Sequence, residues 1–430
     1  MSFQFTDDFK LAYSMMNDTR NHLFITGKAG TGKSTLLRHF KKTTDKNVVF
    51  LAPTGLAAIN VGGQTIHSFF KFPPRPFEPA ELKRRYNKSL FSKLECIVID
   101  EVSMVRADLL DAMDYFLRLM GPDRTLPFGG VQMIFIGDLF QLSPIVRRDF
   151  LGVLHSKGYE SPFFFSALCL EDVEIMHLEL TKIFRQKDAY FLNILNNIRN
   201  NNMDFESLEE LNDICFEQEL IHDEPIIMLC STNDIANAIN KTELEKLEGI
   251  PNTSIASLSG EVDNRHLPCE QALELKLGAQ VMFTRNDAKG NRWVNGSIGT
   301  VSDILKEGIK VDLIDNKGQL NTYLVTKESW DFYKYAFDAG TGKISSKVIG
   351  SITQYPLKLA YAITIHKSQG MTFKQVIIDF GRGAFAPGQV YVAMSRCVSL
   401  AGIELKRKIG PRDIIIDQRV VEYAFQNDIL

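Results

Sequence analysis

The stretch Gly27-Lys28-Ala29-Gly30-Thr31-Gly32-Lys33-Ser34 decides the fold of this chain. An apolar run at 23–25 precedes it, and an amphipathic stretch with Leu36, Leu37 and Phe40 on one face follows it. This order predicts a strand, a glycine-rich loop and a helix. Glycines let successive backbone N–H groups turn inward around a polyphosphate without obstruction by Cβ atoms. The sequence therefore predicts a binding site for a nucleoside triphosphate.

Individual residues of this loop have separate expected roles. The start of the following helix brings a positive dipole end beneath the phosphates. Lys33 can reach the terminal phosphates, and the Ser34 hydroxyl is a suitable ligand for Mg²⁺. We expect the nucleotide to contact the loop and the first residues of the helix, namely Gly27, Ala29, Gly30, Thr31, Gly32, Lys33, Ser34 and Thr35.

An acidic pair, Asp100-Glu101, follows a fully apolar run at 96–99. At the end of a buried strand, Asp100 is placed to hold Mg²⁺ and Glu101 to orient or deprotonate the attacking water. Gln141 comes shortly after another apolar run, at 133–136. Its carboxamide both donates and accepts hydrogen bonds, which suits it to sensing a terminal phosphate or its water. These residues predict a site that hydrolyses the nucleotide.

The composition of the 430 residues is that of a globular protein with more than one domain. The net charge of −3 and the pI near 6.3 exclude a protein that coats DNA by bulk charge, so any nucleic-acid contact must be a local groove. No apolar run is long enough to span a membrane, and no export signal is visible at the N-terminus. We therefore expect a cytoplasmic or nucleoid-associated protein. The six scattered cysteines form no C-x-x-C pair, so we expect free thiols.

Short apolar runs alternate with amphipathic stretches, which predicts an α/β fold with parallel sheets covered by helices on both faces. We expect a first domain at 1–165 that contains an irregular, proline-rich and basic insertion at about 66–90. A second domain is expected from 166–296 and 354–430. Between these two parts, 297–353 alternates short β runs with turn residues, as a small inserted antiparallel β module would.

The second half of the chain contributes motifs that a nucleotide-binding domain alone would not need. Arg185 and Arg396 each follow an apolar stretch, and a dense polar loop at 364–372 follows another. A guanidinium group offers a fixed charge and a planar fork for phosphate oxygens. Two such groups from the second domain would make hydrolysis depend on closure of the domains.

Taken in chain order, these motifs resemble those of superfamily-one helicases, and most specifically the PIF family of DNA helicases, which is related to the RecD type. The resemblance rests on 27–34, Asp100-Glu101, Gly137-Asp138 with Gln141, Leu142 and Pro144, and the stretches 184–186, 365–370 and 391–396. The stretches 52–58, 65–69 and 103–107 favour the PIF family within that group. The resemblance implies two RecA-like P-loop domains, with a small β-barrel inserted in the second at 297–353.

This resemblance implies an ATP-dependent DNA helicase that moves 5′→3′ on single-stranded DNA, unwinds duplex and G-quadruplex DNA, and hydrolyses ATP between its two RecA-like domains. Its cofactors would be ATP and Mg²⁺. Its partners would be single-stranded DNA, duplex/single-strand junctions and G-quadruplex DNA, with no membrane partner, and we expect a monomer. Arg185 and Arg396 would reach the γ-phosphate from the second domain, and Gly370 would lie close to it. The insertion at 66–90 is either a solvated loop or an element that separates strands at a junction.

The resemblance also identifies candidate DNA contacts. They are Pro53, Thr54, Gly55, Thr65, His67, Phe69, His366 and Ser368. Loop N–H groups and hydroxyls bind phosphates without reading sequence, whereas aromatic and imidazole rings can stack on bases. Three alternatives stay open: His67 as an ordinary polar loop residue, Phe69 as a core residue, and His366 as a histidine with purely structural hydrogen bonds.

One position departs from the pattern of the family. Relatives place a glutamine upstream of the phosphate loop to read adenine, and the matching stretch here, Thr6-Asp7-Asp8-Phe9, contains none. Gln4 is the remaining candidate for this role. The preference for ATP over GTP therefore stays open.

Two other classes of function also stay open at this point. The first is a translocase, or DNA-dependent ATPase, that moves on single strands without strong unwinding. The second is a regulatory P-loop ATPase that binds a protein partner, although the polar loop at 364–372 argues against it. RNA is a further possible track, because a groove that reads the backbone need not reject the 2′-hydroxyl.

Overall fold

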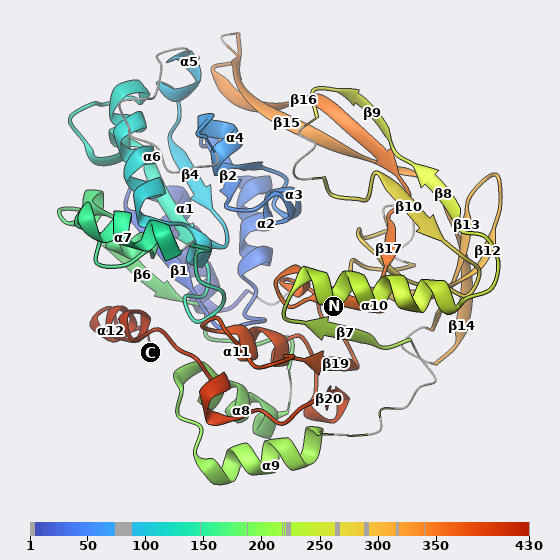
Figure 1. Ribbon diagram of the computed structural model, residues 1–430. Helices are drawn as coiled ribbons and strands as arrows, with labels where there is room; N and C mark the ends of the chain where they lie inside the picture. The colour runs from blue at the N-terminus through green and yellow to red at the C-terminus, as the bar shows by residue number, and fades with distance from the viewer. Residues whose placement is uncertain are drawn as a thin grey trace. The chain divides into compact units, whose positions relative to one another are not determined.

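The computed structural model describes residues 5–73, 88–146, 148–186, 188–216, 218, 220, 225–262, 267–287, 292–314, 318–338 and 340–429 (Figure 1). The chain forms two compact units. Unit 1 contains 1–185, 333–348 and 417–430, and unit 2 contains 186–332 and 349–416. The helices that the structure describes are too short or too polar to cross a lipid bilayer.

Unit 1 contains a six-stranded parallel sheet in the order β3-β2-β4-β5-β1-β6. Its strands are β1 (His22–Thr26), β2 (Val48–Ala52), β3 (Gln64–Thr65), β4 (Cys96–Ile99), β5 (Gln132–Ile136) and β6 (Ile175–Glu179). Every residue of β4 and β5 is buried, as expected for parallel strands covered by helices on both faces. Parallel pairing brings the carboxyl ends of β1, β4 and β5 to the same edge of the sheet.

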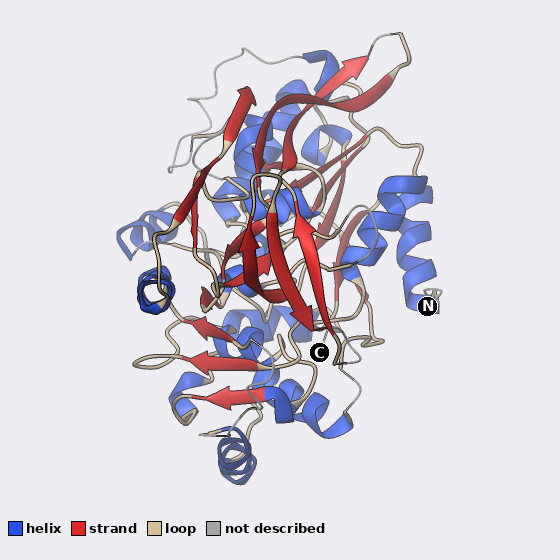
Figure 2. Cartoon of the chain, turned by 90° about the vertical axis from the view of Figure 1, so that its right-hand side faces the viewer, coloured by secondary structure: helices blue, strands red, loops and turns tan. Residues whose placement is uncertain are grey.

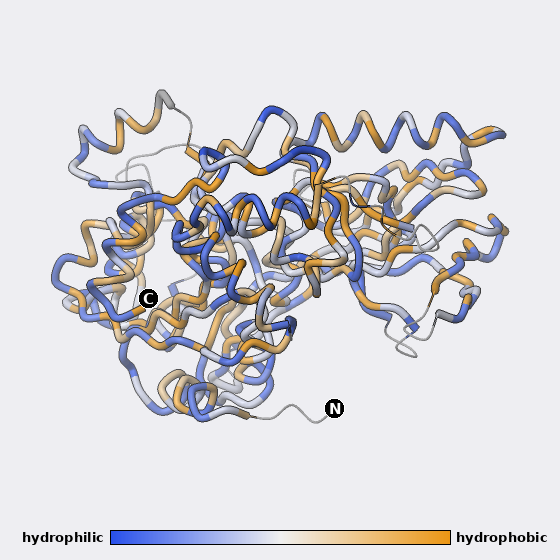
Figure 3. Tube along the Cα trace, turned by 90° about the horizontal axis from the view of Figure 1, so that it is seen from below, coloured by the Kyte–Doolittle hydropathy of each residue, from blue (hydrophilic) through white to orange (hydrophobic). Residues whose placement is uncertain are grey.

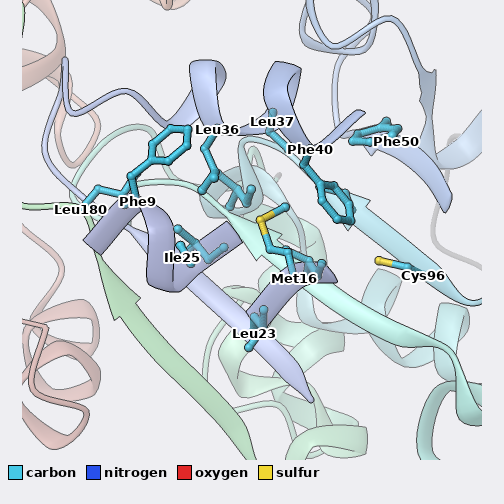
Figure 4. Close-up of a cluster of buried hydrophobic side chains, with 14 residues drawn as sticks. Phe9, Met16, Leu23, Ile25, Leu36, Leu37, Phe40, Phe50, Cys96 and Leu180 are labelled. Carbon is cyan, nitrogen blue, oxygen red and sulfur yellow. The ribbon is translucent and has the colours of Figure 1, made fainter. Parts of the chain in front are cut away.

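The helices of unit 1 follow from the apolar spacing of their sequences. They are α1 (Asp7–Asp18), α2 (Lys33–Thr43), α3 (Gly55–Asn60), α4 (Ile66–Phe70), α5 (Lys88–Phe91), α6 (Ala107–Met120), α7 (Arg148–Ser156) and α12 (Gln418–Gln426). Phe9 and Met16 of α1 and Leu36 and Phe40 of α2 meet the central strands in one buried cluster (Figure 4). Each such side chain stabilises the fold by about 1.5–3 kcal/mol through burial.

The first unit extends beyond the predicted domain limit at residue 165. The reason is β6, which pairs in parallel with β1 along its whole length and therefore completes the first sheet. The sequence around β6 is only partly apolar, and all five of its residues are half-buried, as expected for an edge strand. An edge strand carries a weaker apolar signal than a central one, so its membership of the sheet was hard to predict.

The C-terminal helix α12 also belongs to unit 1 rather than to the second domain as predicted. The Tyr423 hydroxyl and His177 Nε2 of β6 share a hydrogen bond of 2.9 Å. The Tyr423 ring stacks on Phe165 with centroids 4.3 Å apart. These contacts join residues far apart in the sequence, so local patterns did not reveal them.

Unit 2 contains a four-stranded parallel sheet in the order β18-β7-β19-β20. Its strands are β7 (Ile227–Cys230), β18 (Ala362–Thr364), β19 (Val376–Asp379) and β20 (Ile403–Leu405), and its helices are α8 (Ala189–Asn200), α9 (Phe205–Cys215), α10 (Asn233–Lys246) and α11 (Gln389–Met394). Figure 2 shows helices in blue against the red strands of the parallel sheets. The Asn240 carboxamide of α10 pairs with the backbone of Ala362 at 2.7 and 2.9 Å, which fixes this helix on the edge strand β18.

A second, antiparallel sheet of unit 2 has the order β14-β13-β12-β11-β17. Its strands are β11 (Gln280–Phe283), β12 (Ile298–Ile304), β13 (Ile309–Ile314), β14 (Leu320–Val325) and β17 (Leu357–Leu359). The antiparallel module predicted at 297–353 therefore also includes β11 and β17, which lie outside those bounds. Trp293 and Phe283 stack in its core with centroids 4.5 Å apart. Closure of this sheet into a barrel stays a prediction.

The remaining strands form two further sheets. The first is a long hairpin of β15 (Glu328–Asp338) and β16 (Lys343–Gln354) with β9 (Ser257–Gly260), and the second is the pair β8 (Asn252–Ile255) and β10 (Ala272–Leu275). The end of the hairpin, 333–348, belongs to unit 1. There the Phe50 N–H of β2 donates to the Tyr335 hydroxyl at 3.1 Å.

Apolar and polar residues alternate along the helices, as the orange and blue segments of Figure 3 show.

Candidate functional site

The phosphate loop adopts a backbone conformation that favours glycine. Gly30 and Gly32 have φ angles of 86° and 94°, in the left-handed region. A Cβ on Gly27 would lie 2.6 Å from the Leu180 carbonyl oxygen, so a larger residue would displace the adjoining backbone. α2 begins directly after Gly32. The loop therefore turns the N-terminal end of α2 toward its own concave side, as anion binding requires.

The Lys33 side chain folds back over this loop. Its ammonium group donates to the Gly27 carbonyl and, at 3.0 Å, to the Lys28 carbonyl. The Thr31 hydroxyl also donates to the Lys28 carbonyl at 3.0 Å. The positive charge is thus held where the phosphate oxygens of a bound nucleotide would meet it.

The carboxyl ends of three adjacent strands bring the other residues of the site to this loop. β5 lies between β1 and β4, so Gly27, Gly137 and Asp100 follow neighbouring strands. The Gly137 N–H donates to the Ile25 carbonyl at 3.3 Å. Ligands of parallel α/β sheets bind at this edge.

The acidic pair at the end of β4 has an unusual electrostatic setting. The pKa of Asp100 is raised to about 7, first by burial and then by the charge of Glu101, although the Glu101 N–H and the Lys33 ammonium group lower it. Glu101 itself has φ 52° and ψ 45°, a left-handed conformation that is uncommon for glutamate. The Ser34 hydroxyl and the Asp100 carboxylate are oxygen ligands of the kind that Mg²⁺ prefers, so the residues fit a magnesium-bound triphosphate.

Gln141 is held in place by a carboxylate that we did not assign from the sequence. Asp138, almost fully buried, accepts hydrogen bonds from the Gln141 carboxamide and from the Phe140 N–H, both at 3.2 Å. The Gln141 N–H also donates to the Asp138 carbonyl at 3.0 Å. Asp138 therefore fixes the orientation in which the Gln141 carboxamide is presented.

Arg185 lies in unit 1. The sequence predicted instead that the second domain would contribute this arginine. The segment that leads to it runs along the phosphate loop, because the Leu180 N–H donates to the Thr26 carbonyl and the Phe184 N–H to the Gly30 carbonyl, both at 2.9 Å. Arg185 is the last residue of this unit before the chain enters unit 2. The predicted domain boundary at residue 165 lies too early because β6, which follows it, pairs with β1.

Arg396 lies in unit 2, at the end of α11. Its side chain is only 2% exposed. The guanidinium group donates to the Val392 carbonyl at 2.9 Å and to the Ser395 hydroxyl at 2.8 Å. The neighbouring backbone is fixed by Gln186, whose carboxamide donates to the Ser395 and Cys397 carbonyls, both at 3.1 Å. Gln186 is therefore a positioning residue for the turn that carries Arg396.

The polar loop after β18 is largely bonded to itself. The Ser368 side chain is fully buried, and its hydroxyl donates to the Ile365 carbonyl at 2.7 Å. This corrects the expectation that the Ser368 hydroxyl binds DNA, because it is already used inside the loop. Burial lowers the pKa of the half-buried His366, which favours the neutral form of its ring. Gly370 has φ 77°, which explains the glycine at this turn.

A lysine that we did not predict lies near this loop. Lys358 is on β17, in register with Met282 of β11. The pKa of Lys358 is lowered to about 8, chiefly by burial and next by the Lys367 ammonium group, whereas Glu270 acts to raise it. The loop therefore carries one cation, Lys367, and lies near a second cation, Lys358, and the Glu270 carboxylate.

The candidate DNA contacts of unit 1 gather at one edge of its sheet. β2 and β3 are parallel neighbours, and the stretch Pro53, Thr54 and Gly55 follows β2 as His67 follows β3. The Thr54 hydroxyl accepts a hydrogen bond from the Ala57 N–H at 3.3 Å at the start of α3. Thr65 caps α4 in the same way. Two helix starts and their hydroxyls are thus brought together at the carboxyl ends of adjacent strands.

Phe69 is more deeply buried than these partly exposed residues. Its side chain is 7% exposed and makes edge contacts with Phe70, Phe91 and Tyr335 at centroid distances of 5.0, 5.2 and 5.8 Å. This corrects the expectation that the ring stacks on a base, and it agrees with the core alternative. The predicted insertion at 66–90 lies partly, and Gln4 wholly, outside the described residues.

Comparison with known proteins agrees with this arrangement. A family model described as PIF1-like helicase matches residues 7–209, and a model described as helicase matches 343–408. The chain is 34% identical to the ATP-dependent DNA helicase Pif1 of Bdellovibrio bacteriovorus, over 94% of this chain and 88% of the relative. It spans about 60% of the length of the mouse and human relatives that it matches.

Solved structures give the same result. Bacteroides sp. Pif1 in complex with ADP-AlF4 superposes with a TM-score of 0.89 at 35% identity, over 99% of this chain and 98% of that one. Bacteroides Pif1 bound to single-stranded DNA superposes with a TM-score of 0.70, also at 35% identity, over 99% and 97% of the two chains. Together with the strand-end site of unit 1, these matches show that the chain belongs to the PIF1-like family of ATP-dependent DNA helicases.

Proposed function

We propose that this chain uses ATP hydrolysis to move 5′→3′ on single-stranded DNA and to unwind duplex and G-quadruplex DNA. The observation that carries the proposal is the grouping of the phosphate loop, Asp100-Glu101 and Gln141 at adjacent strand ends. The same chain holds Arg396 on a turn that is fixed by a hydrogen bond from Gln186. The single-stranded DNA and the ADP-AlF4 bound by Bacteroides Pif1 support a DNA track and a hydrolysable nucleotide.

The proposed chemistry divides among the residues of unit 1. Lys33 binds the terminal phosphates, while Ser34 and Asp100 hold Mg²⁺, which neutralises charge on the phosphates when bound. Glu101 accepts a proton from the attacking water. Gln141, oriented by Asp138, senses the γ-phosphate.

The proposed coupling adds the arginines. Arg396 and Arg185 contact the γ-phosphate when nucleotide binds, and Gly370 lies close to it, so binding favours a closed arrangement of the chain. Hydrolysis removes these contacts and reverses the change, which moves the DNA-holding loops relative to one another. This is a population shift driven by differential contacts with the nucleotide. The proposed DNA contacts are Pro53, Thr54, Gly55, Thr65, His67 and His366.

Tailed duplexes test this function. We expect strand displacement on substrates with a 5′ single-stranded tail and not with a 3′ tail, and no displacement by Lys33→Ala on either. Hydrolysis stimulated by single strands without displacement of any duplex would favour the translocase instead. Displacement from 3′ tails alone would contradict the proposed direction.

A further inference from the structure

The segment 180–185, called the strap below, lies along the phosphate loop and ends at Arg185. Its Leu180 carbonyl oxygen lies so close to Gly27 that a Cβ on this glycine would come within 2.6 Å of it. Four residues later, the Phe184 N–H donates to a carbonyl group of the same loop at 2.9 Å. The strap is therefore held to the loop at two points, and its course between them decides how the chain reaches Arg185.

The stretch between these two points is held by a carboxylate from another element. One oxygen of Asp8 accepts hydrogen bonds from the Thr181 N–H at 2.8 Å and from the Thr181 hydroxyl at 3.1 Å. The other oxygen accepts from the Phe9 N–H at 2.8 Å. Burial acts to raise the pKa of Asp8, but hydrogen bonds from Thr6, Thr181 and Phe9 lower it below its ordinary value. The carboxylate is therefore ionised at neutral pH, and its bonds to Thr181 are charge-assisted.

The helix that carries Asp8 is a firm support for this contact. Phe9 and Met16 of α1 are buried, and both belong to the same apolar cluster as Leu180 (Figure 4). Because a packed core resists displacement, α1 cannot shift without opening this cluster. Asp8 itself is only partly buried and lies outside the cluster. It therefore links the strap to the core of unit 1 without being part of that core.

We propose that Asp8 is a positioning residue for ATP hydrolysis, which holds Thr181 so that the strap presents Arg185 to the nucleotide. This inference rests on the role proposed above for Arg185 and adds the residue through which unit 1 sets its place. A misplacement of about 1 Å at a reacting group can cost about 10²-fold in rate. Leu180 and Phe184 stay bonded to the loop when Asp8 is removed, so the loss falls on hydrolysis rather than on nucleotide binding.

Two measurements on the full chain test the proposal. They are kcat for ATP hydrolysis with saturating single-stranded DNA, and the Kd for mant-ADP by fluorescence. Asp8→Ala is expected to lower kcat by about 10-fold while the Kd stays within about threefold of wild type. Asp7→Ala is the matched control, because Asp7 has the same charge in the same turn but a fully exposed side chain that pairs with Lys10. A wild-type kcat in Asp8→Ala, or an equal loss in Asp7→Ala, would overturn the proposal.

A double variant separates positioning from a general effect on the fold. If Asp8 acts through Arg185, then Asp8→Ala is expected to cause no further loss of kcat in the Arg185→Ala background. A loss by the same factor in both backgrounds would overturn the proposal. Asp8→Asn keeps a carbonyl oxygen that accepts from Thr181, so it is expected to recover part of the rate that Asp8→Ala loses. A rate no higher than that of Asp8→Ala would contradict the role of this hydrogen bond.

The same variants distinguish this inference from the proposed function. A wild-type kcat in Arg185→Ala would contradict the proposed role of Arg185, and this inference with it. A slow Arg185→Ala variant beside a wild-type rate in Asp8→Ala would contradict this inference alone.

Discussion

The phosphate-loop region of unit 1 and the Arg396 region of unit 2 are built in opposite ways. In the first, Asp100 and Gln141 follow the ends of strands, and Lys33 follows a loop whose glycines adopt left-handed conformations. In the second, Arg396 is buried and bonded to the carbonyl and hydroxyl groups of its own helix end. The first region is organised to receive a ligand in its present form. If Arg396 acts on a phosphate as we propose, its guanidinium group has to exchange these internal hydrogen bonds first.

Replacing Arg396 gives the largest expected effect on this comparison. Arg396→Ala is expected to lower DNA-stimulated hydrolysis by about 10³-fold or more, as for an arginine that acts on the transferred phosphate. The Kd for mant-ADP is expected to stay within a few-fold of wild type, because unit 1 holds the phosphates. Arg396→Lys is the matched control that keeps the charge but loses the fork. Hydrolysis and unwinding near wild-type rates in Arg396→Ala would contradict the coupling.

Glu101→Gln tests the first region in isolation. The change keeps the shape of the side chain but removes the base, so hydrolysis is expected to fall by about 10²-fold or more. Nucleotide binding, measured by mant-ATP fluorescence, is expected to remain. A variant that still turns over ATP near the wild-type rate would show that another group accepts the proton.

Lys358, which lies on β17 near the polar loop of unit 2, tests how much stability the burial of a charge costs there. Its folded pKa of about 8 lies below the ordinary lysine value of 10.5, so the folded state binds the proton less tightly than the unfolded chain. Burial of the Lys358 ammonium group therefore costs no stability above pH 10.5, and the cost grows to its full size as the pH falls to 8. Lys358→Met is expected to raise the free energy of unfolding by about 3 kcal/mol below pH 8, with the difference shrinking toward pH 10.5. Urea denaturation at several pH values measures it, and a gain independent of pH would contradict the account.

Ser368 gives the smallest and most discriminating effect. Its buried hydroxyl donates only within the loop, so Ser368→Ala is expected to cost about 1 kcal/mol of stability. Affinity for single-stranded DNA is expected to stay at the wild-type value. The matched comparison is Thr54→Ala in unit 1, which is expected to weaken DNA binding. Equal weakening by both changes would show that the two regions contact DNA in the same way.

The placement of the phosphate loop, Asp100-Glu101 and Gln141 after strands was predictable because its signals are local. The spacing 27–34 fixes the loop, and Asp100-Glu101 needs only a preceding apolar run to be placed at a strand end. Gln141 follows from the same rule applied to β5. In a parallel sheet such positions converge without any further information from the sequence.

The supporting contacts were not predictable because they join distant parts of the chain. Tyr335 satisfies the backbone of Phe50 across 285 residues, and Gln186 reaches Ser395 across 209. Neither pairing leaves a periodic pattern. Whether a serine in a polar loop, such as Ser368, faces solvent or the loop interior also depends on packing, which composition does not report.

The central claim is that the site in unit 1 hydrolyses ATP in response to DNA. The most direct test is the steady-state ATPase rate of the wild-type chain with increasing single-stranded oligonucleotide. We predict a rate that rises with the oligonucleotide and saturates, and that is absent in Lys33→Ala. A wild-type rate that stays the same at every oligonucleotide concentration would contradict the account.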